Sequence, residues 1–144
     1  MRFQVTLQKR LQVTTDLTEL KQVLLWFEQL QQPTIPRKIW IQCQTALAEG
    51  FTNAVKHAHS NLPPDTVVEI EVTITPQQLE IYVWDSGPPF DLIQKLKSQE
   101  QTFDPTASSG RGLQLIARIA DQINYVRTDD QRNCLSMIKY YQAS

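Results

Sequence analysis

Two runs of alternating apolar and polar residues constrain the fold more than any other feature of the chain. Residues 68–74 place valine or isoleucine at every second position, and residues 79–83 repeat the pattern with leucine, isoleucine and valine. Such alternation indicates β-strands with one buried face. Between them, residues 75–78 read Thr-Pro-Gln-Gln, which suits a turn with proline at its second position. The sequence therefore predicts a β-hairpin.

Apolar residues with helical spacing predict two amphipathic helices before the hairpin. The first covers residues 17–30, with a cap at Thr15 or Asp16, and stops at Pro33. The second covers residues 36–59. Around them, the patterns predict a strand at 3–8, a short helix at 92–96, an irregular segment at 97–109, a helix at 113–120, and strands at 123–126 and 134–140. The mixture predicts an α/β fold.

Four polar residues share one rim of the second helix. At about 100° per residue, Glu49, Asn53, Lys56 and His57 fall within a sector of roughly 100° beside the apolar stripe. A carboxylate, an amide, an ammonium and an imidazole are groups that hold a metal ion, a phosphate chain and a reacting proton. A solvated polar face is the alternative interpretation.

Asp85 lies two residues after Val83, so it is the next residue on the core-facing side of the second hairpin strand. A buried carboxylate is costly without partners, so something should donate a hydrogen bond to it. Alternatively, it caps the turn formed by Asp-Ser-Gly-Pro at 85–88. A second loop, Ser-Ser-Gly-Arg-Gly at 108–112, precedes an apolar helix, where free amide hydrogens suit a phosphate. This loop matches neither the Walker pattern nor the dinucleotide fingerprint.

Composition limits the classes of function. The 144 residues, 41% apolar and 20% charged, are typical of globular proteins, and we expect one domain over residues 1–144. The net charge is -1, which gives no electrostatic case for nucleic acid or an anionic membrane. No long apolar run or leader is present, so we expect a cytoplasmic protein. Cys43 and Cys134 lie in apolar patterns that favour free buried thiols.

These features occur together in a known order. The sequences EGFTNAVKHAH at 49–59, Asp-Ser-Gly at 85–87 and GRGLQLI at 110–116 resemble the N box and the two glycine boxes of the GHKL superfamily of ATPases and kinases. Within it, the chain is most similar to the bacterial anti-sigma-factor serine kinases, and residues 121–139 are also similar. The resemblance implies a histidine-kinase-like ATPase fold: a two-layer α/β sandwich with a mixed, mostly antiparallel sheet and helices on one face.

The resemblance also implies roles for individual residues, with ATP and Mg²⁺ as cofactors. Asn53 would bind Mg²⁺ through its amide oxygen, and Glu49 would be the general base toward a substrate hydroxyl. Asp85 would accept a hydrogen bond from the adenine amino group, and Gly87 would let the backbone approach the base. The residues assigned to the phosphates are Lys56, His57, Ser109, Gly110, Arg111, Gly112 and Leu113.

One departure from the family concerns the adenine side. Many members carry Gly-Thr near the last strand, and this chain reads Gln-Arg-Asn-Cys at 131–134. Asn133 could substitute as the polar partner of the adenine.

The function implied is that of a protein serine/threonine kinase. Its partners would be a small anti-anti-sigma antagonist protein, which it phosphorylates, and a sigma factor or similar regulator, which it holds inactive. A homodimer is among the assemblies that the resemblance allows. Two alternatives stay open: an ATP-gated binding module that transfers nothing, and a catalytic domain that phosphorylates histidine on a separate protein. Glu49 suits a hydroxyl substrate better than an imidazole.

Overall fold

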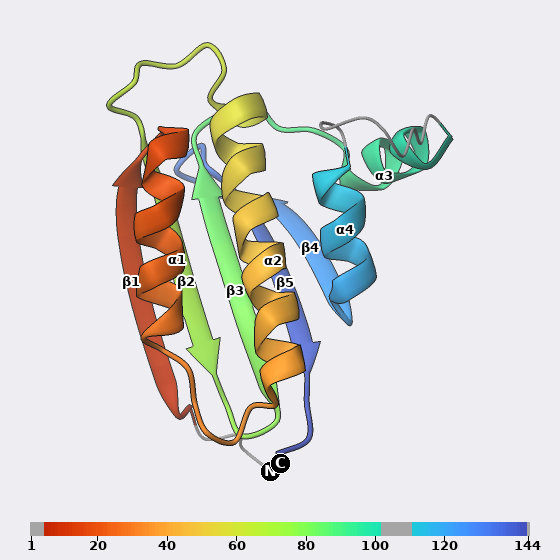
Figure 1. The fold of residues 1–144 in the computed structure, drawn as a ribbon. Coiled ribbons are helices and arrows are strands. Elements are labelled where there is room, and N and C mark those ends of the chain that lie inside the picture. The colour runs from red at the N-terminus through yellow and green to blue at the C-terminus, as the bar shows by residue number, and fades with distance from the viewer. Residues whose placement is uncertain (1–4, 102–110, 144) are drawn as a thin grey trace.

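The computed structural model describes residues 5–101 and 111–143. Its strands form one 5-stranded sheet in the order β1-β2-β3-β5-β4 (Figure 1). The strands are β1 (Leu7–Thr14), β2 (Val67–Ile74), β3 (Gln78–Asp85), β4 (Gln122–Arg127) and β5 (Asn133–Tyr140). The helices are α1 (Leu20–Glu28), α2 (Arg37–Asn53), α3 (Leu92–Gln101) and α4 (Gly112–Ile119). A 3-10 turn (Leu17–Glu19) precedes α1, and a π-helical turn (Ala54–Ala58) extends α2.

The sheet is antiparallel at every described pairing, whereas the family resemblance implied a mixed, mostly antiparallel sheet. The chain explains why. In the sequence, α1 and α2 lie between β1 and β2. The chain runs back along the sheet in α1 and forward again in α2, so β2 starts at the end of the sheet where β1 stops and runs antiparallel to it (Figure 1). The strands β3 and β4 are not neighbours, because β5 pairs with both and lies between them.

The predicted hairpin is confirmed as β2 and β3, paired from Glu69 with Trp84 to Ile74 with Leu79. Thr75 organises its turn, since its hydroxyl accepts hydrogen bonds from the amides of Gln77 and Gln78 at 3.3 and 3.1 Å. An ST-type turn of this kind fixes the hairpin register.

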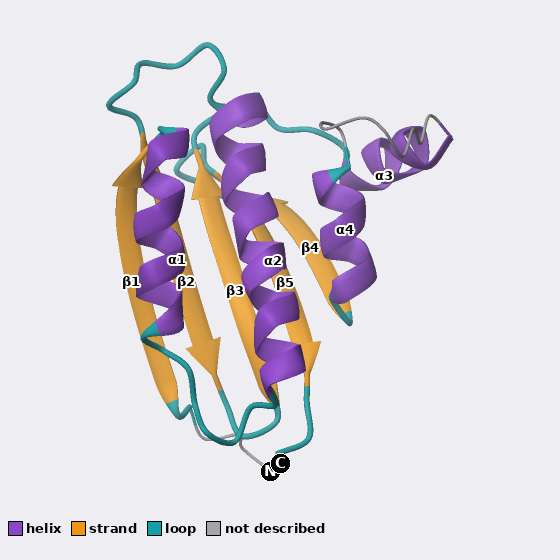
Figure 2. Ribbon diagram, viewed as in Figure 1, coloured by secondary structure: helices purple, strands orange, loops and turns teal. Residues whose placement is uncertain are grey.

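The helices α1, α2 and α4 cover one face of the sheet, and the core lies between the two layers (Figures 1 and 2). Helix α2 supplies the centre of the core with Trp40, Leu47 and Phe51, none of which has exposed surface. Trp40 stacks on Phe27 of α1 with 4.2 Å between ring centroids. This packing anchors α2 from end to end, so that its polar rim is held on a rigid element.

On the opposite face of the sheet, long side chains cover strand β2. Strand β2 is buried on both faces, although its alternation predicted one buried face. Its outward carboxylates are bound by arginines: Glu71 by Arg10 at 3.0 Å, and Glu69 by Arg132 at 2.7 Å. Both arginines also lie over the ring of Trp84. Burial of these carboxylates is tolerated because each is paired.

Several predicted boundaries differ from the structure. The strand predicted at 3–8 corresponds to β1, which begins at Leu7 and continues to Thr14; residues 3 and 4 lie outside the described part. Residues 97–101, expected to be irregular, belong to α3, and residues 102–109 lie outside the described part. The long second helix is confirmed, but it changes from α to π geometry after Asn53. Alternation and helical spacing indicate which side chains are buried, but they do not determine the residues at which a helix or strand begins and ends.

Candidate functional site

The polar rim of α2 faces the start of α4. Glu49 and Asn53 lie one turn apart in α2 and are half-buried, whereas Lys56 and His57 lie in the π-helical turn and are exposed. A Cβ atom added to Gly112 would lie 2.8 Å from Glu49 Oε2. The carboxylate therefore sits directly against the first residue of α4, at a spot that a side chain would crowd. The structure thus brings the first and third sequence motifs together.

The second motif, residues 85–87, lies at the end of β3. It is beside the end of the helical segment that consists of α2 and the π-helical turn after it. Asp85 is 4% exposed, as its phase in the strand predicted. Its Oδ1 accepts hydrogen bonds from the amide of Gly87 at 2.9 Å and from Asn133 Nδ2 at 2.8 Å. A Cβ added to Gly87 would lie 2.1 Å from the carbonyl oxygen of Ala58, so only glycine fits there. Both bonds reach Oδ1, and no hydrogen bond given for the described residues uses Oδ2.

Asn133 supports this turn from the neighbouring strand. It has no exposed surface and pairs with Asp85 in the register of β3 and β5. Its Nδ2 also donates to the carbonyl oxygen of Gly87 at 2.8 Å. Both of its N–H groups are therefore used by the protein. Arg127 of β4 donates to Asn133 Oδ1 at 3.1 Å and to the same Gly87 carbonyl at 3.0 Å.

Two histidines flank this arrangement in different environments. His59 is 3% exposed, and its Nε2 accepts a hydrogen bond from the amide of Ser86 at 2.8 Å. Burial lowers the pKa of His59, against the opposing effect of the Asp85 carboxylate. Partial burial, followed by the charges of Lys95 and Lys56, lowers the pKa of the more exposed His57. The imidazoles are therefore biased toward the neutral form.

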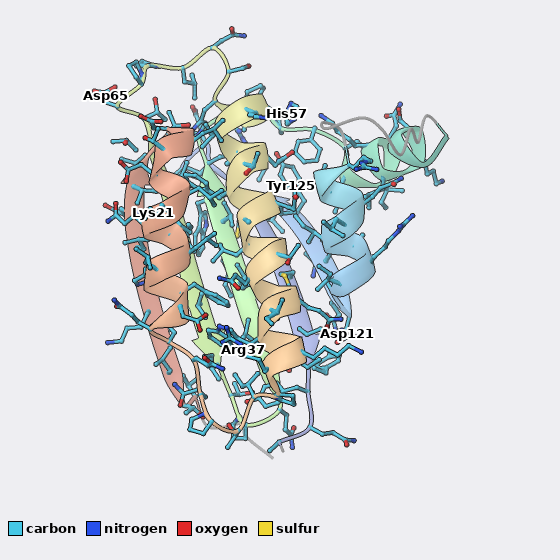
Figure 3. The ribbon with its side chains drawn as sticks, viewed as in Figure 1. Lys21, Arg37, His57, Asp65, Asp121 and Tyr125 are labelled. Carbon is cyan, nitrogen blue, oxygen red and sulfur yellow. The ribbon has the colours of Figure 1, made fainter. Side chains whose placement is uncertain are left out.

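Aromatic packing continues the site toward α3. Phe90, in the loop after Gly87, stacks on Tyr125 of β4 with ring centroids 4.1 Å apart. Lys95 of α3 lies with its ammonium 5.1 Å from the centre of the Phe90 ring. Figure 3 shows His57 at the end of the helical segment and Tyr125 on the side of α4. These contacts tie the start of α3 to the sheet.

The remaining predicted residues lie at the start of α4. Ser109 and Gly110 fall outside the described residues. Arg111 occupies the cap position of α4, and its own side chain does not cap the helix by a hydrogen bond. Leu113 is 1% exposed and belongs to the core, so a contact with a ligand would fall to its backbone amide.

Sequence reasoning missed two residues of this site, Arg127 and His59. Arg127 lies in a strand whose pattern gives no sign of a contact with Gly87, 40 residues away. The sequence placed His59 at the end of the predicted helix and gave no sign of its contact with Ser86. Register and tertiary packing place both, and neither follows from local spacing.

In residues 5–101 and 111–143, no group of three or more His, Cys, Asp or Glu side chains could hold a metal ion. Within the same residues, no helix combines the length and apolar character needed to cross a membrane.

Comparison with known proteins finds several similar relatives, and three of them are described here. A serine-protein kinase RsbW of Bacillus licheniformis is 33% identical over 84 residues, which are 55% of this chain and 52% of that protein. The anti-sigma F factor of Pasteuria penetrans is 29% identical over 102 residues, 70% of this chain and 68% of that protein. RsbW of Bacillus subtilis is 31% identical over 83 residues, 54% of this chain and 51% of that protein. The chain thus spans about half the length of the RsbW relatives.

A family model described as the histidine kinase-like ATPase domain matches residues 13–139. The matched range contains every described element of the site, from Glu49 on α2 to Asn133 on β5. With the five-stranded sheet, the helices on one face and the motifs gathered at one end, the chain belongs to the family of histidine kinase-like ATPase domains.

Proposed function

We propose that residues 1–144 form one ATP-binding domain that acts as a protein serine/threonine kinase of the anti-sigma type. The observation that carries the proposal is the position of the Glu49 carboxylate against Gly112, with Asn53 one turn further along α2. A base, a metal ligand and the N-terminus of a helix meet there, which are the groups that phosphoryl transfer needs.

The adenine would bind at the turn after β3. Asp85 Oδ2 would accept a hydrogen bond from the adenine amino group, while Oδ1 is held by Gly87 and Asn133. A carboxylate that already has two protein donors is fixed in orientation before the ligand arrives. We infer that Asn133 acts through Asp85, because both of its N–H groups are engaged by the protein. Arg127 would hold the same turn from β4.

The phosphates and Mg²⁺ would lie between α2 and the start of α4. The Asn53 side chain does not cap the turn that follows it, so its amide oxygen can serve as a hard ligand. An ion held there by Asn53 would supply positive charge that offsets the charge of the phosphates. The further groups proposed for the phosphates are Lys56, His57, Arg111, the backbone of Gly112 and Leu113, and Ser109 and Gly110.

Glu49 would act as the general base. Its carboxylate would take the proton of a serine or threonine hydroxyl as that oxygen bonds to the γ-phosphorus. The bond between this phosphorus and the β,γ-bridging oxygen would break, and ADP would leave. A positioned base is worth about 10² to 10⁴ in rate.

The names of the relatives support the partner classes. Two are named serine-protein kinases and one is named an anti-sigma F factor. We therefore propose that the substrate is a small antagonist protein with an acceptor hydroxyl, and that the second partner is a sigma factor held inactive. A homodimer is part of this proposal, and the mass of the purified chain in solution tests it. We also propose that the protein acts in the cytoplasm.

A phosphotransfer assay with the Glu49→Gln variant tests the proposal. Purified chain, Mg-ATP labelled on the γ-phosphate and candidate antagonist proteins from the same organism are mixed, and labelled protein is counted after acid treatment. We expect acid-stable label, a loss of about 10²-fold or more in transfer by the variant, and unchanged ATP affinity. The matched variant Glu19→Gln, which changes a carboxylate before α1, should keep both activities.

Three results would contradict parts of the proposal. Unchanged transfer by Glu49→Gln would remove this residue from the mechanism. Tight ATP binding with no transfer to any candidate would favour the ATP-gated binding module. Label that is lost in acid would indicate phosphohistidine as the product.

A further inference from the structure

The end of the helical segment that begins with α2 rests on the turn after β3 through two adjacent residues. The amide of Ser86 donates to His59 Nε2 at 2.8 Å, and Gly87 lies so close to Ala58 that no Cβ fits between them. His59 is itself held by its own amide, which donates to the carbonyl oxygen of Ala54 at 2.9 Å. The buried imidazole therefore bridges the π-helical turn and the Asp85 turn.

This bridge joins the two ends of the proposed ATP site. Glu49 and Asn53 lie on α2, which leads directly into the π-helical turn, whereas Asp85 lies on β3. Any shift of the turn relative to the helix would change the separation between the adenine carboxylate and the groups proposed for Mg²⁺ and phosphate. Misplacement by about 1 Å is enough to cost substantial binding or rate at such sites.

We propose that His59 is a positioning residue for ATP, and that its neutral imidazole accepts the Ser86 amide and so fixes the turn that presents Asp85. The inference rests on the proposed function of ATP binding. His59 touches neither the phosphates nor the reacting hydroxyl in this proposal, and it acts through Ser86 and Asp85.

The hydrogen bond from Ser86 forms only when His59 Nε2 carries no proton, so the imidazole must be neutral. Because Nε2 accepts from Ser86, the proton of the neutral ring is on Nδ1. A second proton on Nε2 would face the Ser86 N–H, and the bond would be lost. Nδ1 is buried without a hydrogen-bond partner among the described residues, so the protonated ring would gain nothing there to offset this loss.

Burial keeps the ring neutral near pH 7, since it lowers the pKa of His59 from 6.5. Among the described titratable groups, Asp85 at the end of β3 is the one whose charge acts on this ring, and it opposes the shift. A lowered folded-state pKa means that the unfolded chain binds the extra proton first as the pH falls. The contribution of His59 is therefore present above about pH 6.5 and is lost as the pH falls through the lowered value.

Two substitutions separate positioning from simple packing. His59→Gln can place an amide oxygen near Nε2, so it keeps an acceptor for Ser86 but does not titrate. His59→Phe keeps a ring of similar size and removes the acceptor. The experiment measures Mg-ATP affinity by calorimetry and urea unfolding without ATP, each at pH 8.0 and pH 5.5, for the 144-residue chain and both variants. The pH also changes the protonation of ATP, but this affects all the proteins equally. It therefore drops out when the affinities of two proteins are compared at the same pH.

We expect the glutamine variant to match the unmodified chain in Mg-ATP affinity within about twofold at pH 8.0. The phenylalanine variant should bind ATP about threefold to tenfold more weakly at pH 8.0, the usual effect of one hydrogen bond. Its affinity relative to the glutamine variant should not change with pH. Unfolding at pH 8.0 should show the same order. Between pH 8.0 and pH 5.5 the unmodified chain should lose more unfolding free energy than the glutamine variant, because its unfolded state binds the extra proton at His59.

Other outcomes overturn the inference. Equal ATP affinity of the phenylalanine variant and the unmodified chain at pH 8.0 would show that the Ser86 bond does not position the ligand. Equal losses of unfolding free energy from pH 8.0 to pH 5.5 in the glutamine variant and the unmodified chain would show that the folded chain does not hold His59 neutral. A lack of ATP binding by the unmodified chain would refute the proposed function instead, and the unfolding data would then decide whether His59 holds the turn.

Discussion

Replacing Asn133 by alanine should destabilise the fold by about 2 to 4 kcal/mol. The substitution removes a hydrogen bond to the buried Asp85 carboxylate and one to the carbonyl oxygen of Gly87. A hydrogen bond to a charged group is worth about 1.5–3 kcal/mol, and a neutral one about 0.5–1.5 kcal/mol. Arg127 also loses a partner, but its exposed side chain can turn to water and should add little.

Urea unfolding of Asn133→Ala gives this free energy directly. The control is Asn124→Ala, which removes an exposed asparagine from β4 and should cost less than about 0.5 kcal/mol. A loss below about 1 kcal/mol in Asn133→Ala, close to the control value, would refute the reasoning that Asn133 supports a buried carboxylate. A second variant, Asn133→Asp, places a carboxylate opposite Asp85 and should be less stable at pH 7 than at pH 4, because two adjacent carboxylates can share one proton.

Three further predictions concern close contacts and thiols. Gly87→Ala should destabilise the chain by about 3 kcal/mol and abolish ATP binding, because the backbone oxygen of Ala58 cannot move aside; native stability in urea would contradict the contact. Gly112→Ala should fold normally, since the atom it meets ends the flexible Glu49 side chain, yet should lower phosphotransfer at least tenfold; unchanged transfer would show that this carboxylate need not sit there. Burial raises the pKa of Cys134 to about 11, so alkylation of its thiol at pH 8 should be slow and should rise about tenfold per pH unit up to that value; rapid labelling at pH 8 would refute the burial argument.

Periodicity was enough to predict most of the elements. The hairpin and the helix from residue 36 follow from side chains that must alternate or recur to reach one core, and the structure confirms both. Periodicity could not give the order of the strands. The position of β5 between β3 and β4 depends on contacts between distant parts of the chain. For the same reason it left open whether the sheet was mixed.

The site was predictable in part. The phase of β3 placed Asp85 on the buried side, and the structure agrees at 4% exposure. Its partner Asn133 is 48 residues away and becomes a neighbour only through strand pairing. His59 and Arg127 contact the same turn from two other elements. Local patterns thus predict where a polar group must be satisfied, and the tertiary structure determines which residue satisfies it.

A calorimetric titration of the chain with ATP, with and without Mg²⁺, tests the account most directly. Asp85→Asn is titrated beside it, because the amide keeps the shape of the carboxylate and loses its charge. The account predicts saturable binding that Mg²⁺ strengthens and that the variant weakens by roughly 1.5 to 3 kcal/mol. No binding at millimolar ATP, or equal affinity of the variant and the unmodified chain, would contradict it.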